Sequence, residues 1–227
     1  MIGFYDYTVI LTYCSVISAV AGIAVTLSGS GHPFFGILFL MFCGLCDAFD
    51  GKVARTKTDR TKNEKNFGIQ IDSLSDLIAF GVLPVCIGVS MWSSKLGYAR
   101  GNLLSRIPLP VIIIISCLYI LATVIRLAYF NVTEDEIQSS GTKKREFYTG
   151  LPVTSASLIF PTFMMLQYAI QADISFVYYI VMLFVAAAFV GNFKVKKPGL
   201  KMILIMVGIG AIEFGVILLL RIVTHHV

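Results

Sequence analysis

The chain has 227 residues, of which 57% are hydrophobic and 14% are charged, and its formal net charge is +5. Soluble domains carry about 25% charged residues, so this composition excludes an ordinary soluble protein and is typical of an integral membrane protein. Membrane lipids are therefore its expected surroundings, and no nucleic-acid partner is expected.

Apolar segments long enough to cross a bilayer, which takes about 20 residues per helix, recur along the whole chain. Because helices satisfy their own backbone hydrogen bonds in lipid, the sequence predicts an all-α, polytopic membrane protein with about seven transmembrane helices. No long polar stretch separates them, so residues 1–227 are expected to form a single integral-membrane domain. The predicted spans cover residues 8–28, 33–51, 69–92, 108–130, 151–171, 174–192 and 200–223.

Basic residues collect on one side of the predicted bundle. Of the 18 lysines and arginines, all but Lys95, Arg100, Arg106 and Arg221 lie in or beside the loops after the second, fourth and sixth spans. By the positive-inside rule these loops face the cytoplasm. The first span lacks the basic start of a secretory signal peptide, and we expect it to be a retained helix. The protein is therefore expected in the cell membrane as a multi-pass protein.

Four aspartates interrupt the apolar pattern where the second predicted span ends and the third begins. A charge near the middle of a membrane helix costs about 2.5–3.5 kcal/mol, so acids in such segments usually mark function. At about 100° per residue, Asp47 and Asp50 lie within roughly 60° of each other, and Asp72 and Asp76 within roughly 40°. The two spans are antiparallel neighbours, so we expect the four side chains to converge in one pocket near the cytoplasmic surface.

Converging carboxylates repel one another, and a hard divalent cation with oxygen ligands would neutralise them. Two such ions can stabilise both the attacking and the leaving oxygen of a phosphoryl displacement. The alternative is that individual acids are interfacial and pair with Lys52 or Arg55. For all four acids together, the sequence favours a metal site.

Small and basic residues follow the first acid pair. Gly51 and Ala54 leave room for a ligand close to the backbone, although small residues also allow close helix packing in membranes. The guanidinium of Arg55 suits a phosphate or diphosphate, or else it only fixes the topology.

Eight positions in this region form one ordered pattern. It resembles the signature of the CDP-alcohol phosphotransferase family and consists of Asp47-x2-Asp50-Gly51-x2-Ala54-Arg55 followed by Gly68-x3-Asp72-x3-Asp76. The gap at residues 56–67 is longer than usual for the family, but extra loop length costs little free energy. We therefore expect the acids to stay in place.

Further stretches resemble the integral-membrane phosphatidylserine synthases of bacteria and archaea within this family. They are NFGIQIDSLSDLIAFGVLP at 66–84, RLAYFNV at 126–132 and GLP at 150–152, and the strongest resemblance covers residues 34–160. The resemblance implies direct transfer of the phosphatidyl group from CDP-diacylglycerol to L-serine, giving phosphatidylserine and CMP. It also implies a homodimer.

The resemblance assigns a role to each motif position. Asp47, Asp50, Asp72 and Asp76 would share two divalent cations, Mg²⁺ or Mn²⁺, with Asp76 also the catalytic base for the serine hydroxyl. The CDP portion would be bound by Gly51, Ala54, Arg55 and Gly68. Serine carries a carboxylate, so a cation outside the metal site is expected, and Arg126 is the first candidate for binding the acceptor or its phosphate partner. Asn131 and Tyr148 are further candidates.

Two other functions stay open. The same chemistry could use another acceptor, such as glycerol 3-phosphate or inositol phosphate, or an archaeal lipid donor. Alternatively, the acids could form the ion path of a divalent-cation transporter. Transporters commonly place their ion sites around the membrane midplane, whereas these acids cluster at one end beside a basic loop.

Overall fold

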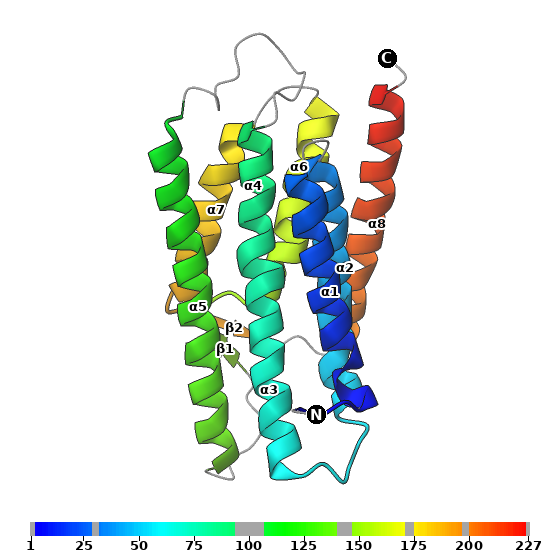
Figure 1. The fold of residues 1–227 in the computed structure, drawn as a ribbon, viewed down its shortest axis with the longest axis vertical. Helices are drawn as coiled ribbons and strands as arrows, with labels where there is room; N and C mark the ends of the chain where they lie inside the picture. The colour runs from blue at the N-terminus through cyan, green and yellow to red at the C-terminus, as the bar shows by residue number, and fades with distance from the viewer. Residues whose placement is uncertain are drawn as a thin grey trace.

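The computed structural model describes residues 3–28, 32–93, 107–139, 147–170, 175–196 and 200–225. Long helices run side by side in one bundle (Figure 1). Five of them are long and apolar enough to cross a membrane, and two shorter apolar helices cover Val153–Gln167 and Phe176–Val190. These helices match the predicted spans, so the prediction of a polytopic all-α membrane protein is confirmed.

Short 3-10 turns and one π-helical segment adjoin the α-helices of the described residues. In chain order they are the 3-10 turn η1 (Tyr7–Val9), α1 (Ile10–Leu27), α2 (Pro33–Ala54), α3 (Lys62–Asp76), the π-helical segment η2 (Leu77–Val82), α4 (Leu83–Ser93), α5 (Leu109–Ser139), the 3-10 turn η4 (Val153–Ser155), α6 (Ala156–Ile170), α7 (Ser175–Val190) and α8 (Leu200–His225). Two short strands, β1 (Phe147–Thr149) and β2 (Lys194–Lys196), pair antiparallel with Tyr148 opposite Val195.

α3 begins at Lys62, before the predicted start of the third span at residue 69. Its first turn is polar and is stabilised by a capping box. The Glu64 amide donates to Oγ1 of Thr61 over 3.2 Å, and the Thr61 amide donates to the Glu64 carboxylate over 2.7 Å. Because hydropathy marks only the part of a helix that lies in lipid, the pattern missed this polar extension.

The segment directly after Asp76 is held by hydrogen bonds from neighbouring helices. Pro84 has no amide hydrogen, so the carbonyl of Phe80 loses its usual helical donor. The Tyr119 hydroxyl on α5 donates to that carbonyl over 2.7 Å, and the Tyr178 hydroxyl on α7 donates to the carbonyl of Pro84 over 2.7 Å. These bonds fix the π-helical segment, and with it the end of α3, against α5 and α7.

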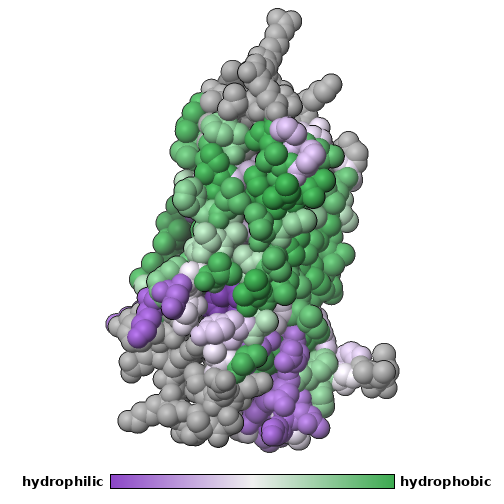
Figure 2. All heavy atoms as spheres, turned by 90° about the vertical axis from the view of Figure 1, so that its left-hand side faces the viewer, coloured by the Kyte–Doolittle hydropathy of each residue, from purple (hydrophilic) through white to green (hydrophobic). Residues whose placement is uncertain are grey.

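The surface of the bundle is divided into an apolar body and a polar end. On the face drawn in Figure 2, the body of the bundle is broadly apolar, and polar side chains gather at the lower end, where α3 begins. Inside, the core contains packed aromatic rings such as those of Tyr119 and Phe160, whose centroids are 5.9 Å apart. The candidate site lies near the boundary between the apolar body and the polar end.

Candidate active site

A cavity of about 1340 Å³ lies among α2, α3, α5, η4, α6 and α8. Its lining includes both predicted groups of motif residues. They are the aspartates Asp47, Asp50, Asp72 and Asp76 and the predicted CDP-binding residues Gly51, Ala54, Arg55 and Gly68. Residues separated by a stretch of twelve residues, 56–67, therefore line one cavity, as the helical spacing predicts.

Three of the aspartates come together most closely. One carboxylate oxygen from each of Asp47, Asp50 and Asp72 lies within 4.8 Å of the other two. Asp50 is buried, it accepts a hydrogen bond from the Gly51 amide, and the Thr12 hydroxyl of α1 lies 3.5 Å from its Oδ2 atom. α1 therefore contacts the cluster through Thr12.

Asp76 is not one of the three acids in this cluster. It is buried one turn further along α3 from Asp72, and it lines the same cavity. The neighbouring Ser75 donates to the carbonyl of Thr12 over 3.3 Å, which fixes this turn of α3 against α1. The predicted convergence of four acids therefore takes the form of three clustered carboxylates and a fourth that lines the same cavity.

The chemistry of the cluster fits a divalent cation. All three candidate ligands are carboxylates, the ligand type that hard cations such as Mg²⁺ prefer. Within the described part of the chain, neither Lys52 nor Arg55 forms an ion pair with these acids. The acids thus have no cationic side-chain partner among those residues, and the interfacial alternative has no support there.

Gly68 makes room for a basic residue that the motif does not include. A Cβ atom at position 68 would come within 2.6 Å of the Arg60 Nη2 atom. The Arg60 guanidinium lines the cavity and donates to the carbonyls of Ala54 and Glu64 over 3.4 and 3.1 Å. Because Arg60 lies in the loop that is longer than usual for the family, no pattern in the sequence identified it.

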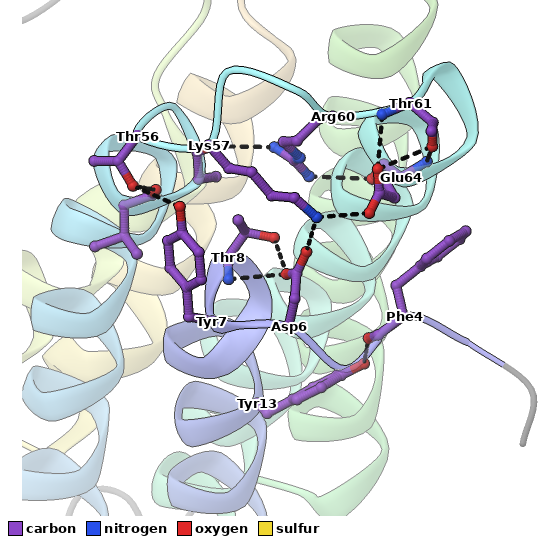
Figure 3. A network of polar contacts seen from close by, with 12 residues as sticks. Phe4, Asp6, Tyr7, Thr8, Tyr13, Thr56, Lys57, Arg60, Thr61 and Glu64 are labelled. Atoms are coloured by element: carbon purple, nitrogen blue, oxygen red, sulfur yellow. Dashed lines mark hydrogen bonds and ion pairs between the residues drawn. The ribbon is translucent and has the colours of Figure 1, made fainter.

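The same loop is tied to the N-terminal segment by a polar clasp, made of Asp6, Lys57 and Glu64 (Figure 3). The Lys57 ammonium lies 2.8 Å from a carboxylate oxygen of each acid. Its hydrogen bond, with further bonds from Thr8, lowers the pKa of Asp6 to about 2. The clasp fixes the loop between α2 and α3 beside the site, and no pattern in the sequence predicted it.

Two of the three predicted acceptor residues line the cavity. Arg126 on α5 is 6% exposed, donates from Nε to the carbonyl of Leu151 over 3.1 Å, and lies 5.7 Å from the centroid of the Phe130 ring. Asn131 accepts a hydrogen bond from the Ser73 hydroxyl over 2.9 Å. The side chain of Tyr148 lies outside the described part of the structure, and its backbone belongs to β1.

Gly150 lies in the turn whose next residue, Leu151, accepts the hydrogen bond from Arg126. Its φ of +75° is unfavourable for residues with a side chain, and a Cβ would lie 2.7 Å from the carbonyl oxygen of Phe189. The amides of Gly150 and Leu151 donate to the carbonyls of Phe193 and Ala188 over 2.8 and 3.0 Å. This turn places the Leu151 carbonyl where Arg126 binds it.

Together, the fold and the site define a polytopic helical membrane protein with a carboxylate-lined cavity at one end. The model of the CDP-alcohol phosphatidyltransferase family matches residues 8–184. This match extends in both directions beyond residues 34–160, the range of strongest resemblance in the sequence. The chain belongs to this family. Members of the family generally use divalent cations.

Curated relatives cover bacteria, archaea and yeast. The chain is 30% identical over 158 residues to the CDP-diacylglycerol–serine O-phosphatidyltransferase of Saccharomyces cerevisiae, covering 68% of this chain and 51% of the yeast protein. It is 34% identical over 131 residues to the Helicobacter pylori protein of the same name, covering 57% and 46%. It is 29% identical over 164 residues to the archaetidylserine synthase of Methanothermobacter thermautotrophicus, covering 72% and 60%. The chain thus spans about half the length of the first two relatives.

Proposed function

We propose that this protein transfers the phosphatidyl group of CDP-diacylglycerol to L-serine, giving phosphatidylserine and CMP. The observation that carries the proposal is the clustering of Asp47, Asp50 and Asp72 within 4.8 Å, at motif positions of a CDP-alcohol phosphatidyltransferase. The names of the yeast and bacterial relatives support serine as the acceptor. We treat residues 1–227 as one catalytic domain.

The four aspartates are proposed as the ligands of two divalent cations, Mg²⁺ or Mn²⁺. When bound, such ions would neutralise the diphosphate and stabilise the charge that develops on the departing CMP. The oxygen-only composition of the cluster and the absence of ion pairs to it among the described residues support this assignment.

Asp76 is proposed as the general base. It would accept the proton of the serine hydroxyl, whose oxygen attacks the lipid-side phosphorus while the bond from that phosphorus to the CMP oxygen breaks. Its position on the cavity wall, outside the cluster of three, supports a role that differs from ligation alone. The reaction is a direct displacement and needs no covalent intermediate with the protein.

The remaining cavity residues are proposed to bind the substrates. Gly51, Ala54, Arg55 and Gly68 would contact the CDP portion. Arg126 and Asn131, with Tyr148, would bind the carboxylate of serine or the phosphate beside it. The position of Arg126, held against Leu151 and Phe130, supports a preformed anion site in this wall.

The topology and the assembly are also proposed. The excess of basic residues beside the loops after the second, fourth and sixth spans supports a cell-membrane protein whose active site faces the cytoplasm. A homodimer is expected by analogy with the family.

The test is release of CMP by the purified protein with CDP-diacylglycerol, Mg²⁺ or Mn²⁺, and labelled L-serine. We expect CMP and labelled phosphatidylserine to form in equal amounts. Glycerol 3-phosphate and inositol phosphate serve as competing acceptors, and an ether-linked archaeal donor tests the alternative named by the archaeal relative. Release of CMP only with another acceptor would overturn the serine assignment. Divalent-cation flux into proteoliposomes without CMP release would favour a transporter.

A further inference from the structure

The lining of the cavity changes in character along α2. Leu38 and Leu45, together with Met206 of α8, belong to its apolar part, and the acids follow further along α2. Beyond the acids, the end of α2, the loop after it and the first turn of α3 add basic side chains. They are Lys52, Arg55, Lys57, Arg60 and Lys65. The part of the cavity nearest the polar end of the bundle therefore carries positive charge.

The two motif glycines lie at equivalent places on α2 and α3. Gly51 follows Asp47 by four residues, and Gly68 precedes Asp72 by four residues. Each glycine therefore lies within about 40° of its aspartate and about 6 Å from it along the helix axis. α2 ends and α3 begins toward the polar end of the bundle (Figure 1). Both glycines are thus one turn nearer to that end than the acids.

An arginine guanidinium lies beside each of these glycines. A Cβ atom at position 51 would lie 3.5 Å from Nη1 of Arg55, and a Cβ atom at position 68 would lie 2.6 Å from Nη2 of Arg60. Arg55 belongs to the family motif, whereas Arg60 does not. The two guanidinium groups nevertheless occupy matching positions, one turn from the acids on α2 and on α3.

Arg60 is held in place but keeps an unused hydrogen-bond donor. Its Nη1 and Nη2 atoms donate to the carbonyls of Ala54 and Glu64 over 3.4 and 3.1 Å. Its Nε atom is enclosed and has no acceptor among the residues that the structure describes, and Arg60 forms no ion pair with those residues. An enclosed donor without an acceptor is costly, and an anionic ligand would remove that cost.

The acid closest to hand for neutralising Arg60 is engaged elsewhere. The backbone carbonyl of Glu64 binds Arg60, but its carboxylate lies 2.8 Å from the Lys57 ammonium and accepts a hydrogen bond from the Thr61 amide over 2.7 Å (Figure 3). The clasp of Asp6, Lys57 and Glu64 therefore leaves the charge of Arg60 available to a ligand in the cavity.

The two ends of a nucleotide-activated lipid need different surroundings. Its acyl chains are apolar and are stable only in the apolar body of the bundle, so its nucleotide extends toward the polar end. Of the two phosphates, the one attached to cytidine is then nearer to that end, where Arg60 lies. A guanidinium can bind phosphate oxygens through two parallel hydrogen bonds. The position and the chemistry of Arg60 thus both suit the cytidine-side phosphate.

We propose that Arg60 binds the cytidine-side phosphate of the donor, and that the clasp keeps its charge free to do so. This inference rests on the proposed function, because the donor is taken to be CDP-diacylglycerol. When the bond to the lipid-side phosphorus breaks, the oxygen that keeps the electron pair belongs to this same phosphate. Arg60 therefore also stabilises the charge that develops on the departing CMP.

The first test measures CMP binding to the intact protein in detergent by isothermal titration calorimetry, with Mg²⁺ and without serine. A hydrogen bond to a charged group corresponds to roughly tenfold or more in affinity, so Arg60→Ala is expected to raise the Kd of CMP by that factor. Cytidine has no phosphate, and its Kd is expected to change by less than about twofold. Lys62→Ala is the matched control, because Lys62 is an exposed cation that does not line the cavity.

The comparison of CMP with cytidine also shows whether the variant keeps a folded site. An equal loss of affinity for both ligands, or an unchanged Kd of CMP in Arg60→Ala, would overturn the phosphate assignment. Arg60→Lys is the second variant, since it keeps the charge and loses the planar fork. Its Kd of CMP is expected to lie between those of the wild type and Arg60→Ala.

The role of the clasp is tested by releasing the Glu64 carboxylate. Lys57→Met removes the cation that holds this carboxylate, so Glu64 can pair with Arg60, and we expect the Kd of CMP to rise severalfold. Glutamine can replace glutamate in a capping box. The double variant Lys57→Met/Glu64→Gln is therefore expected to return to within about twofold of the wild type. A double variant that binds CMP as weakly as Lys57→Met would show that the clasp does not keep Arg60 free.

Failure of this inference and failure of the proposed function give different results. If Arg60→Ala weakens CMP binding and the wild type releases no CMP from CDP-diacylglycerol with serine, the serine assignment fails and Arg60 remains a phosphate-binding residue. If the wild type releases CMP with serine and Arg60→Ala binds CMP normally, the assignment of Arg60 fails and the proposed function stands.

Discussion

Gly68 and Arg60 lie so close that a single added carbon at position 68 would reach within 2.6 Å of the Arg60 guanidinium. The motif glycine therefore leaves space for a basic side chain supplied by the loop, as well as for any ligand. The family signature alone gives no indication of this contact, because Arg60 is not one of its positions.

Gly68→Ala is expected to displace the end of Arg60, and a flexible side chain can yield at little cost. We expect the free energy of unfolding to change by less than about 1 kcal/mol and the donor KM to rise severalfold. The measurement is steady-state CMP release in wild type, Gly68→Ala, Arg60→Ala and the double variant. If Gly68→Ala acts through Arg60, it has little further effect in the Arg60→Ala background. Fully additive effects would show that Gly68 acts independently.

Substitution of the clustered acids is expected to remove metal-dependent turnover. Asp50→Asn or Asp72→Asn should lower kcat by about a hundredfold or more, since a bound metal contributes several kcal/mol of transition-state stabilisation. Chelation by EDTA should abolish activity, and excess Mg²⁺ or Mn²⁺ should restore it in the wild type. Asp59→Asn is the control, because Asp59 is an exposed acid in the loop between α2 and α3 and does not line the cavity. Unchanged activity after chelation would argue against the metal site.

Asp76→Asn separates base catalysis from donor binding. Loss of a general base typically lowers the rate by about 10² to 10⁴, and we expect kcat to fall within that range. The KM for CDP-diacylglycerol should change much less than kcat, because the three clustered acids are intact. Wild-type turnover in this variant would exclude Asp76 as the base.

The clasp of Asp6, Lys57 and Glu64 should make stability depend on pH in the acid range. The pKa of Asp6 is lowered from 3.8 to about 2 in the folded protein, mainly by Lys57. A lowered folded-state pKa contributes stability that is complete above the unfolded-state pKa and is lost as the pH falls through the folded-state value. Between about pH 4 and pH 2 the thermal midpoint of the wild type should therefore fall more than that of Asp6→Asn.

The measurement is thermal unfolding of the detergent-solubilised protein across that pH range. Asp59→Asn again serves as the control and should follow the wild-type curve. Parallel curves for Asp6→Asn and the wild type would show that the clasp does not stabilise the fold.

Gly150→Ala is expected to destabilise the turn that holds the Leu151 carbonyl. A strained backbone conformation costs about 1–3 kcal/mol, to which the contact with the Phe189 carbonyl adds. Because Arg126 binds Leu151, the serine KM should rise as well. Gly208→Ala is the control, since a Cβ there meets no atom within 4 Å. A lowered midpoint for Gly150→Ala with an unchanged serine KM would separate the turn from acceptor binding.

The acid pairs were predictable because helical spacing alone sets which residues share a face. Asp47 and Asp50 had to point together, and a short loop had to return the chain beside them. The position of Asp76 outside the cluster of three was not predictable, because it depends on how α3 packs against α1 through Ser75 and Thr12.

Features made by distant polar contacts were missed for a related reason. Hydropathy identifies α8 as a span but not the face that meets the cavity, and the pairing of β1 with β2 joins segments from two separate loops. The capping box at Thr61 and Glu64 was visible as letters in the sequence, yet the apolar pattern placed the helix start further on. Local polar signals would have corrected that boundary.

The continuous cavity, acidic at one end and apolar between α2 and α8, joins two solvents. In the proposed reaction, the effective concentration of serine is its molarity in water. The effective concentration of the donor is its mole fraction among the lipids around the protein. Diluting the membrane with inert lipid would therefore slow the reaction even when the total amount of donor is constant. Diluting the aqueous phase at fixed serine concentration would not.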